Sequence, residues 1–139
     1  MNIEEILRDL REALVQRALN ELHEAQLFHY ELDREHTYSR LANLFDVALR
    51  CVAEGDASAV VSHANRIARE RFESGYDLSE VQTSINIMEE VLCARLVAAI
   101  PAQEVASALG LINTIFSLTK DTLAQAYVNL ASGQPPKKR

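Results

Sequence analysis

The chain has 139 residues, of which 48% are hydrophobic and 24% charged, and its formal net charge is −6 at pH 7. This composition excludes wholesale disorder, and four glycines with three prolines are too few for a fold with many β-turns. The negative charge also disfavours binding to nucleic acid.

The N-terminus and the cysteines predict a cytoplasmic protein. The chain begins Met1-Asn2-Ile3-Glu4-Glu5, which lacks the basic start and apolar core of a signal peptide. No run of about eighteen apolar residues is present, so we expect no membrane segment. The two cysteines, Cys51 and Cys93, have no metal-type spacing and fit a reducing compartment as packed apolar groups.

The first predicted helix opens at Asn2, which can form a capping box with Glu5. One apolar stripe at helical spacing then continues as far as Ala25. Between His29 and Ser39 the stripe is lost and charged side chains gather. We interpret this segment as a break between helices, with one long bent helix as the alternative.

A second helix is expected from about Tyr38 to Ala53, because apolar residues recur there at helical spacing. Gly55 is expected to end it and Asp56 to cap a third helix. The inward residues of that third helix run from Val60 to Phe72.

A tight corner is predicted around Gly75, between a helix ending at Ser74 and another beginning at Leu78. Gly75 lies where the chain must turn left-handed, which costs glycine no steric strain. Asp77 can cap the next helix, and Glu80 can return a hydrogen bond to the cap backbone. Tyr76 and Val81 are placed as an apolar pair across that cap. The corner, formed by Gly75, Tyr76, Asp77 and Glu80, is a structural signal without catalytic chemistry.

The fourth and fifth predicted helices complete the chain. The fourth runs from Leu78 to Ala99, and Pro101 suits the first position of the fifth, which continues to about Leu130. The expected fold is therefore all-α, a helical bundle of about five helices with a long C-terminal helix. Residues 1–131 are predicted to form a single domain and residues 132–139 a flexible basic tail.

The fifth helix carries few charges, namely Glu104, Lys120 and Asp121. One broad face is apolar and the opposite face is made of small residues, which is typical of a helix at the centre or at an interface. We predict a homodimer with an interface formed by Leu111, Ile115 and Leu118. The competing account is that the first helix covers this face within one chain.

The obvious candidates for metal or haem ligands are His23, His29, His36 and His63. None forms an i,i+4 pair and no HExxH is present, so we interpret them as solvated or hydrogen-bonded. Glu89 and Glu90 lack the Glu-x-x-His partners of a di-metal site, and Asn86 is expected at the watery edge of its helix. Phosphate, dinucleotide and nucleophile motifs are absent. We therefore predict no metal, no cofactor and no catalysis.

One set of residues points to a family. The segments Leu41–Val52, Glu54–Asp56 and Ile67–Arg71, followed by Gly75, Leu78 and Glu80-Val81, resemble the RsbRD-type N-terminal domain. This domain occurs in regulators like the RsbT co-antagonists of bacterial stress signalling, where it precedes an output module. The resemblance covers about Leu41 to Leu130 and defines no ligand residues.

The resemblance implies a dimeric sensory or regulatory input domain that works through signals or protein partners and is not an enzyme. The chain ends at Arg139 without an output module, so we expect a stand-alone regulator or a fragment. The alternative function is a globin-like sensor that holds haem or a small ligand through one histidine.

Overall fold

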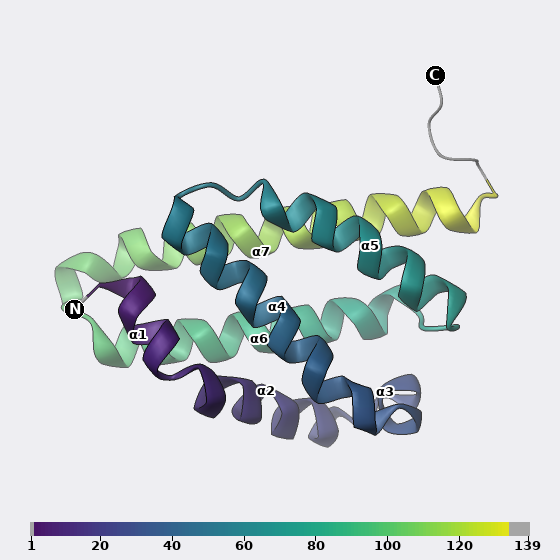
Figure 1. Ribbon diagram of the computed structural model, residues 1–139, viewed down its shortest axis with the longest axis horizontal. Coiled ribbons are helices and arrows are strands. Elements are labelled where there is room, and N and C mark those ends of the chain that lie inside the picture. Colours follow the sequence, from purple (N-terminus) through teal and green to yellow (C-terminus); the bar gives the residue numbers. More distant parts are fainter. Residues whose placement is uncertain (1, 134–139) are drawn as a thin grey trace.

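The computed structural model describes residues 2–133, and every regular element within that range is an α-helix (Figure 1). In chain order they are α1 (Ile3–Asp9), α2 (Arg11–Ala25), α3 (Phe28–Leu32), α4 (Arg34–Glu54), α5 (Ala59–Glu73), α6 (Leu78–Ala99) and α7 (Ala102–Ala131). The all-α fold and the long C-terminal helix are confirmed. The described range holds seven helices, so the expected count of about five is too low. Most of the predicted basic tail, residues 134–139, lies outside the described residues.

The helices pack around one core, with α6 and α7 as an antiparallel hairpin (Figure 1). Helix α5 lies along α7, α4 crosses the hairpin, and α2 lies against α4 and α6. The centre is filled by large apolar side chains less than 2% exposed, among them Phe45, Met88, Leu92, Ile112 and Phe116. No helix in the described range combines the length and the apolar character needed to cross a membrane.

The first predicted helix is divided into α1 and α2 at Leu10, whose backbone leaves helical geometry at φ −103° and ψ 11°. Both parts bury apolar side chains, Ile6 and Leu7 in α1 and Leu14 and Val15 in α2. The two short helices both pack against α4 and α6. The prediction of one continuous helix was wrong because tertiary packing, with no glycine or proline, produces this bend.

The expected break between helices is present but shorter than predicted. Helix α2 ends before Gln26, which is left-handed at φ 52°, and the short helix α3 follows. Helix α4 already begins at Arg34 rather than near Tyr38. The charged side chains that look like a loop in sequence instead surround the start of α4. There the carboxylate of Asp33 accepts hydrogen bonds from the side chains of His36 and Arg40.

Of three predicted boundaries, one is as expected and two differ by small amounts. Gly55 ends α4 at φ 66° as expected. Asp56 does not cap α5, because its carboxylate accepts from the backbone N–H of Ser58 at 3.0 Å in a local turn and α5 begins at Ala59. Pro101 directly precedes α7 rather than being its first residue.

At the corner between α5 and α6, the chain closes α5 with paired backbone hydrogen bonds. The N–H of Tyr76 donates to the carbonyl of Arg71 at 2.9 Å, and the N–H of Gly75 donates to that of Phe72 at 3.1 Å. Gly75 has a φ of 88°, which makes this a Schellman ending. The corner fixes where α6 starts and how it leaves α5.

The substitution Gly75→Val should lower the free energy of unfolding by at least about 1 kcal/mol, because a β-branched residue resists a positive φ. A Cβ at this position would also lie 3.4 Å from Nε2 of His29. Urea unfolding measures the change. Gly75→Asn should cost less, since asparagine tolerates the left-handed region. An unchanged midpoint in the valine variant would show that the corner does not need glycine.

Candidate functional site

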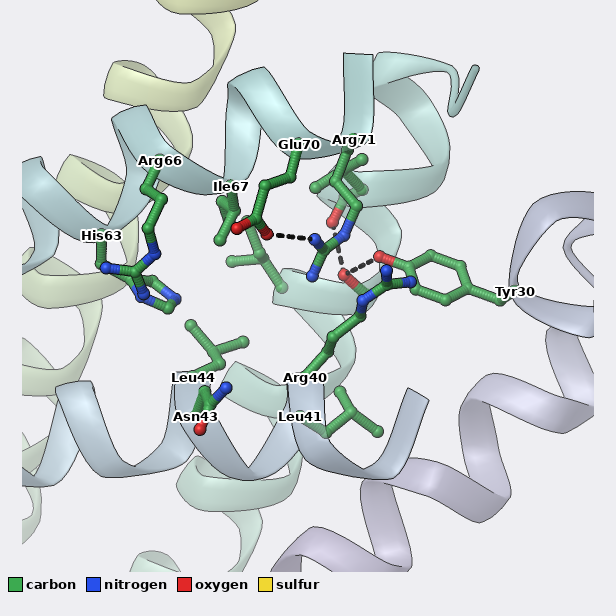
Figure 2. A pocket seen from close by; sticks show the side chains of 13 residues that line it. Tyr30, Arg40, Leu41, Asn43, Leu44, His63, Arg66, Ile67, Glu70 and Arg71 are labelled. Carbon is green, nitrogen blue, oxygen red and sulfur yellow. Dashed lines mark hydrogen bonds and ion pairs between the residues drawn. The ribbon is translucent and has the colours of Figure 1, made fainter. Parts of the chain in front are cut away.

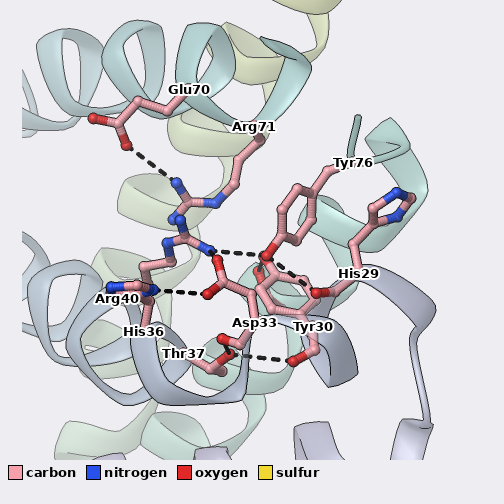
Figure 3. A network of polar contacts seen from close by, with 10 residues as sticks. His29, Tyr30, Asp33, His36, Thr37, Arg40, Glu70, Arg71 and Tyr76 are labelled. Carbon is pink, nitrogen blue, oxygen red and sulfur yellow. Dashed lines mark hydrogen bonds and ion pairs between the residues drawn. The ribbon is translucent and has the colours of Figure 1, made fainter. Parts of the chain in front are cut away.

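A network of polar contacts surrounds the α5–α6 corner, with Tyr76 at its centre (Figure 3). Nη1 of Arg40 in α4 donates to Asp33 at 2.7 Å and to the Tyr76 hydroxyl at 2.8 Å. Nη1 of Arg71 in α5 pairs with the carboxylate of Glu70 at 3.1 Å. The guanidinium carbons of Arg40 and Arg71 lie 5.7 and 5.9 Å from the centre of the Tyr76 ring. The aromatic ring thus stabilises two neighbouring cations.

Glu80 connects α3 to the start of α6. Its Oε1 accepts the backbone N–H of Asp77 at 2.9 Å and lies 2.7 Å from Nδ1 of His29, while Oε2 accepts the His29 backbone N–H at 3.0 Å. Because a carboxylate only accepts, the contact assigns the imidazole proton to Nδ1. Desolvation raises the pKa of Glu80, but these hydrogen bonds outweigh it and the pKa is lowered. Glu80 is therefore an ionised, buried cap for two helices.

A pocket of about 100 Å³ lies beside this network, between α4, α5 and α6 (Figure 2). The basic side chains Arg40, Arg66 and Arg71 reach it from two helices, and Glu70 is the acidic residue of its wall. The hydroxyl of Tyr30, which lines the same pocket, donates to Ser84 at 3.0 Å. The wall is thus positively charged in a protein whose net charge is negative.

Arg71 is the most buried of these arginines, since only 5% of its side chain is exposed. Its Nε has no hydrogen-bond partner. A guanidinium carries five N–H donors, and a buried donor without an acceptor costs free energy. The pocket therefore contains a buried cation with unmet hydrogen-bonding capacity.

His63 lines the same pocket and is 4% exposed. Burial lowers its pKa from the ordinary 6.5 to about 4, and the charges of Arg66 and Arg71 act in the same direction. Its Nδ1 lies 3.1 Å from Nη2 of Arg66. As a neutral ring at pH 7, His63 can accept a hydrogen bond from that guanidinium.

The structure does not bring the four candidate histidines together. His23 lies near Arg34 and His36 beside Asp33, away from the pocket that His63 lines. Within residues 2–133, no group of three or more histidine, cysteine, aspartate or glutamate side chains could hold a metal ion.

The remaining residues considered in the sequence form no site: they pair with neighbours, are buried or face solvent. Glu89 pairs with Lys120 at 3.2 Å, and Lys120 also donates to Asn86, which is exposed as expected. Cys51 is fully buried, and burial raises the pKa of its thiol; burial also raises the pKa of Cys93. Glu90 is exposed on α6.

The three residues predicted for a dimer interface have different surroundings in the single chain. Ile115 is 1% exposed and packs in the chain's own core. Leu111 and Leu118 are partly buried against that core. Only the two leucines retain surface that a second chain could contact.

Sequence reasoning missed the arginine-lined pocket, although α5 carried a signal for it. His63 and Arg71 fall on the helix face that also holds Val60, Ile67 and Ala68, which are buried. Charged or titratable residues on an apolar stripe are unusual, because burying them needs partners. A charged or titratable residue on an apolar helix face, such as His63 or Arg71, is therefore a sequence signal for a buried polar site.

Comparison with known protein families places most of the chain in one of them. The family described as RsbT co-antagonist protein rsbRD N-terminal domain matches residues 5–130. The match begins well before Leu41, where the sequence resemblance began, and so includes the N-terminal helices. No curated protein and no solved structure matches the chain.

Replacing Glu80 with alanine should lower the free energy of unfolding by about 1–3 kcal/mol, because two backbone N–H groups lose their acceptor at a largely buried site. Glu90→Ala, which removes an exposed carboxylate from the same helix, is the matched control and should change little. Chemical denaturation compares the two. Equal effects would contradict the double capping role of Glu80.

The buried imidazole of His63 predicts a pH dependence of stability. The unfolded chain binds this proton near pH 6.5 and the folded chain near pH 4, so stability should fall as pH decreases through that window. His63→Leu should flatten the slope there, whereas His23→Gln should not. Unfolding midpoints between pH 5 and 7 measure it, above the ordinary pKa values of 3.8 for Asp33 and 4.5 for Glu80. An unchanged slope in His63→Leu would place the titration elsewhere.

Proposed function

We propose that this chain, which belongs to the RsbT co-antagonist protein rsbRD N-terminal domain family, is a non-catalytic regulatory input domain of bacterial stress signalling. It acts through contacts with proteins, including a second copy of itself. The observation that carries the proposal is the family match over residues 5–130, which spans nearly all of the helical structure.

The outer side of α7 supports self-association. Between Val105 and Thr119 this helix has no charged residue, and its exposed positions there are small or uncharged: Ala106, Ser107, Gly110, Asn113 and Thr114. A helix can approach such a surface closely. The partly buried side chains of Leu111 and Leu118 belong to the same segment of α7 and add apolar area.

Gly110 gives a more specific reason. Glycine within a helix costs about 1 kcal/mol relative to alanine. A Cβ at Gly110 would meet nothing within 4 Å in the single chain, so packing inside the chain does not require glycine there. Close approach of a helix from a second chain would require it.

The alternative of a globin-like haem sensor gains no support from the geometry around His63. The pocket there measures about 100 Å³. Pockets for drug-sized ligands measure roughly 300–1,000 Å³, and haem is larger than most such ligands. A haem in this place would also meet the guanidinium groups of Arg40 and Arg71.

Light scattering at tens of micromolar tests the proposed dimer. The wild type should have twice the chain mass of 15.5 kDa. Gly110→Leu should dissociate while remaining helical, because its new side chain is accommodated on the single chain and obstructs a second helix. Gln16→Leu, at an exposed position of α2, is the control and should remain dimeric. Ile115→Glu would not test the interface, since it places a charge in the core.

A monomeric wild type would contradict self-association. A dimer that persists in Gly110→Leu would move the interface away from this side of α7. In cells, the Gly110→Leu chain should fail to restore a stress response that is impaired when the wild-type chain is deleted.

A further inference from the structure

We propose that the pocket between α4, α5 and α6 binds a small free oxyanion, a phosphate or a compact carboxylate. This inference deepens the proposed function, because such an anion would be the signal that the regulatory domain senses. The pocket, its charges and one unsatisfied buried donor carry the proposal.

The charges around the pocket favour an anion. Its wall contains the guanidinium groups of Arg40, Arg66 and Arg71 against the single carboxylate of Glu70. Asp33, outside the wall, pairs with Arg40, and even when it is counted the cations remain in excess. This local excess occurs in a chain with a net charge of −6. A positive pocket in a negative protein attracts small anions selectively to one place.

Arg71 supplies the second, independent observation. Its side chain is 5% exposed, and its ion-pair partner is Glu70, whose own side chain is 55% exposed. The buried Nε of Arg71 has no hydrogen-bond partner. The planar guanidinium fork matches the paired oxygens of a carboxylate or phosphate, so an oxyanion would satisfy this donor and compensate the buried charge.

The dimensions limit the ligand to a compact one. A volume of about 100 Å³ exceeds what one water molecule requires and is far below that of a pocket for a drug-sized ligand. Arg66 and the neutral ring of His63 stand on one side of the pocket, and Arg40 and Arg71 on the other (Figure 2). A phosphate group could therefore receive hydrogen bonds from both sides.

Binding would connect α4 with α5, the helix that leads into the corner. Arg40 belongs to α4, whereas Arg66 and Arg71 belong to α5. Because Arg40 and Arg71 both lie against the Tyr76 ring, an anion between them would reduce their mutual repulsion and fix α4 against the corner. The ligand would therefore shift the domain toward a more rigid conformation, the one that it binds best.

The competing account is that Arg71 has a structural role only, as a packed cation beside Tyr76. Under that account Arg71→Gln changes stability in every buffer alike. Under the proposal, the anion raises the unfolding midpoint of the wild type and this increase is reduced in the variant. The dependence of stability on the ligand therefore separates the two roles.

Calorimetric titration of the full chain with inorganic phosphate tests the proposal, with acetate and succinate as carboxylate probes and sodium chloride at matched ionic strength. Saturable binding of phosphate or of a carboxylate is expected, and the probe that binds identifies the group recognised. Arg66→Gln and Arg71→Gln should weaken binding about ten-fold or more, as expected for loss of a charge-assisted hydrogen bond. Arg69→Gln removes an equal charge from an exposed position of α5. It should bind within about two-fold of the wild type, because Arg69 does not line the pocket and its charge acts only through screening solvent.

Arg66 is exposed, so its variant tests the pocket even if Arg71→Gln does not fold. Absence of saturable binding by every probe would overturn the proposal. Equal weakening in Arg69→Gln would overturn it too, since it would indicate screening of the whole surface. The chain mass measured in the same samples reports separately on self-association, so failure of the anion site is distinguishable from failure of the proposed function.

Discussion

The carboxylate of Glu80 is the contact on which the rest of the polar architecture depends. It accepts the N–H of His29 in the first turn of α3 and the N–H of Asp77, the N-cap residue of α6, which otherwise have no intrahelical partner. By holding α3 against the corner it also places the His29 carbonyl, which accepts the Tyr76 hydroxyl at 3.3 Å. The guanidinium carbons of Arg40 and Arg71 in turn lie 5.7 and 5.9 Å from the centre of the Tyr76 ring. One buried anion is thus linked, through α3 and Tyr76, to two arginines of the pocket wall.

A buried cation with an unmet donor is costly, and the fold can carry it because the surrounding core is otherwise well satisfied. Neighbouring buried polar groups are paired: the Tyr127 hydroxyl donates to the Tyr76 carbonyl at 2.9 Å, and Thr119 donates to the carbonyl of Ile115. In natural proteins, exceptions to the rule that buried polar groups are hydrogen-bonded tend to lie at functional sites. Within residues 2–133, three buried side-chain atoms have no hydrogen-bond partner, namely Nε2 of His23, Oε2 of Glu31 and Nε of Arg71, and of these residues Arg71 is the one that lines the pocket.

The parts of the fold that local chemistry determines could be predicted from the sequence. The left-handed Gly55 needs only its neighbours, and Pro101 sets the extended backbone of Ile100 by steric contact. The bend at Leu10 could not be predicted, because it accompanies contacts with distant residues: the next residue, Arg11, pairs with Asp46 in α4, 35 positions away. The pocket was missed for the same reason: it forms only where distant helices cross.

For the long helix α7, the sequence correctly predicts a broad apolar face but not which element covers it. Its broad apolar face is covered within the chain, mainly by α5 and α6, which is why Ile115 is buried there. The competing account had the first helix as the cover. What remains for a partner is the small, uncharged side around Gly110. Helix α5 contributes Arg66 and Arg71 to the pocket and also lies along α7. A ligand that stiffens α5 would therefore act on the helix that carries the proposed interface, with no other element needed between them.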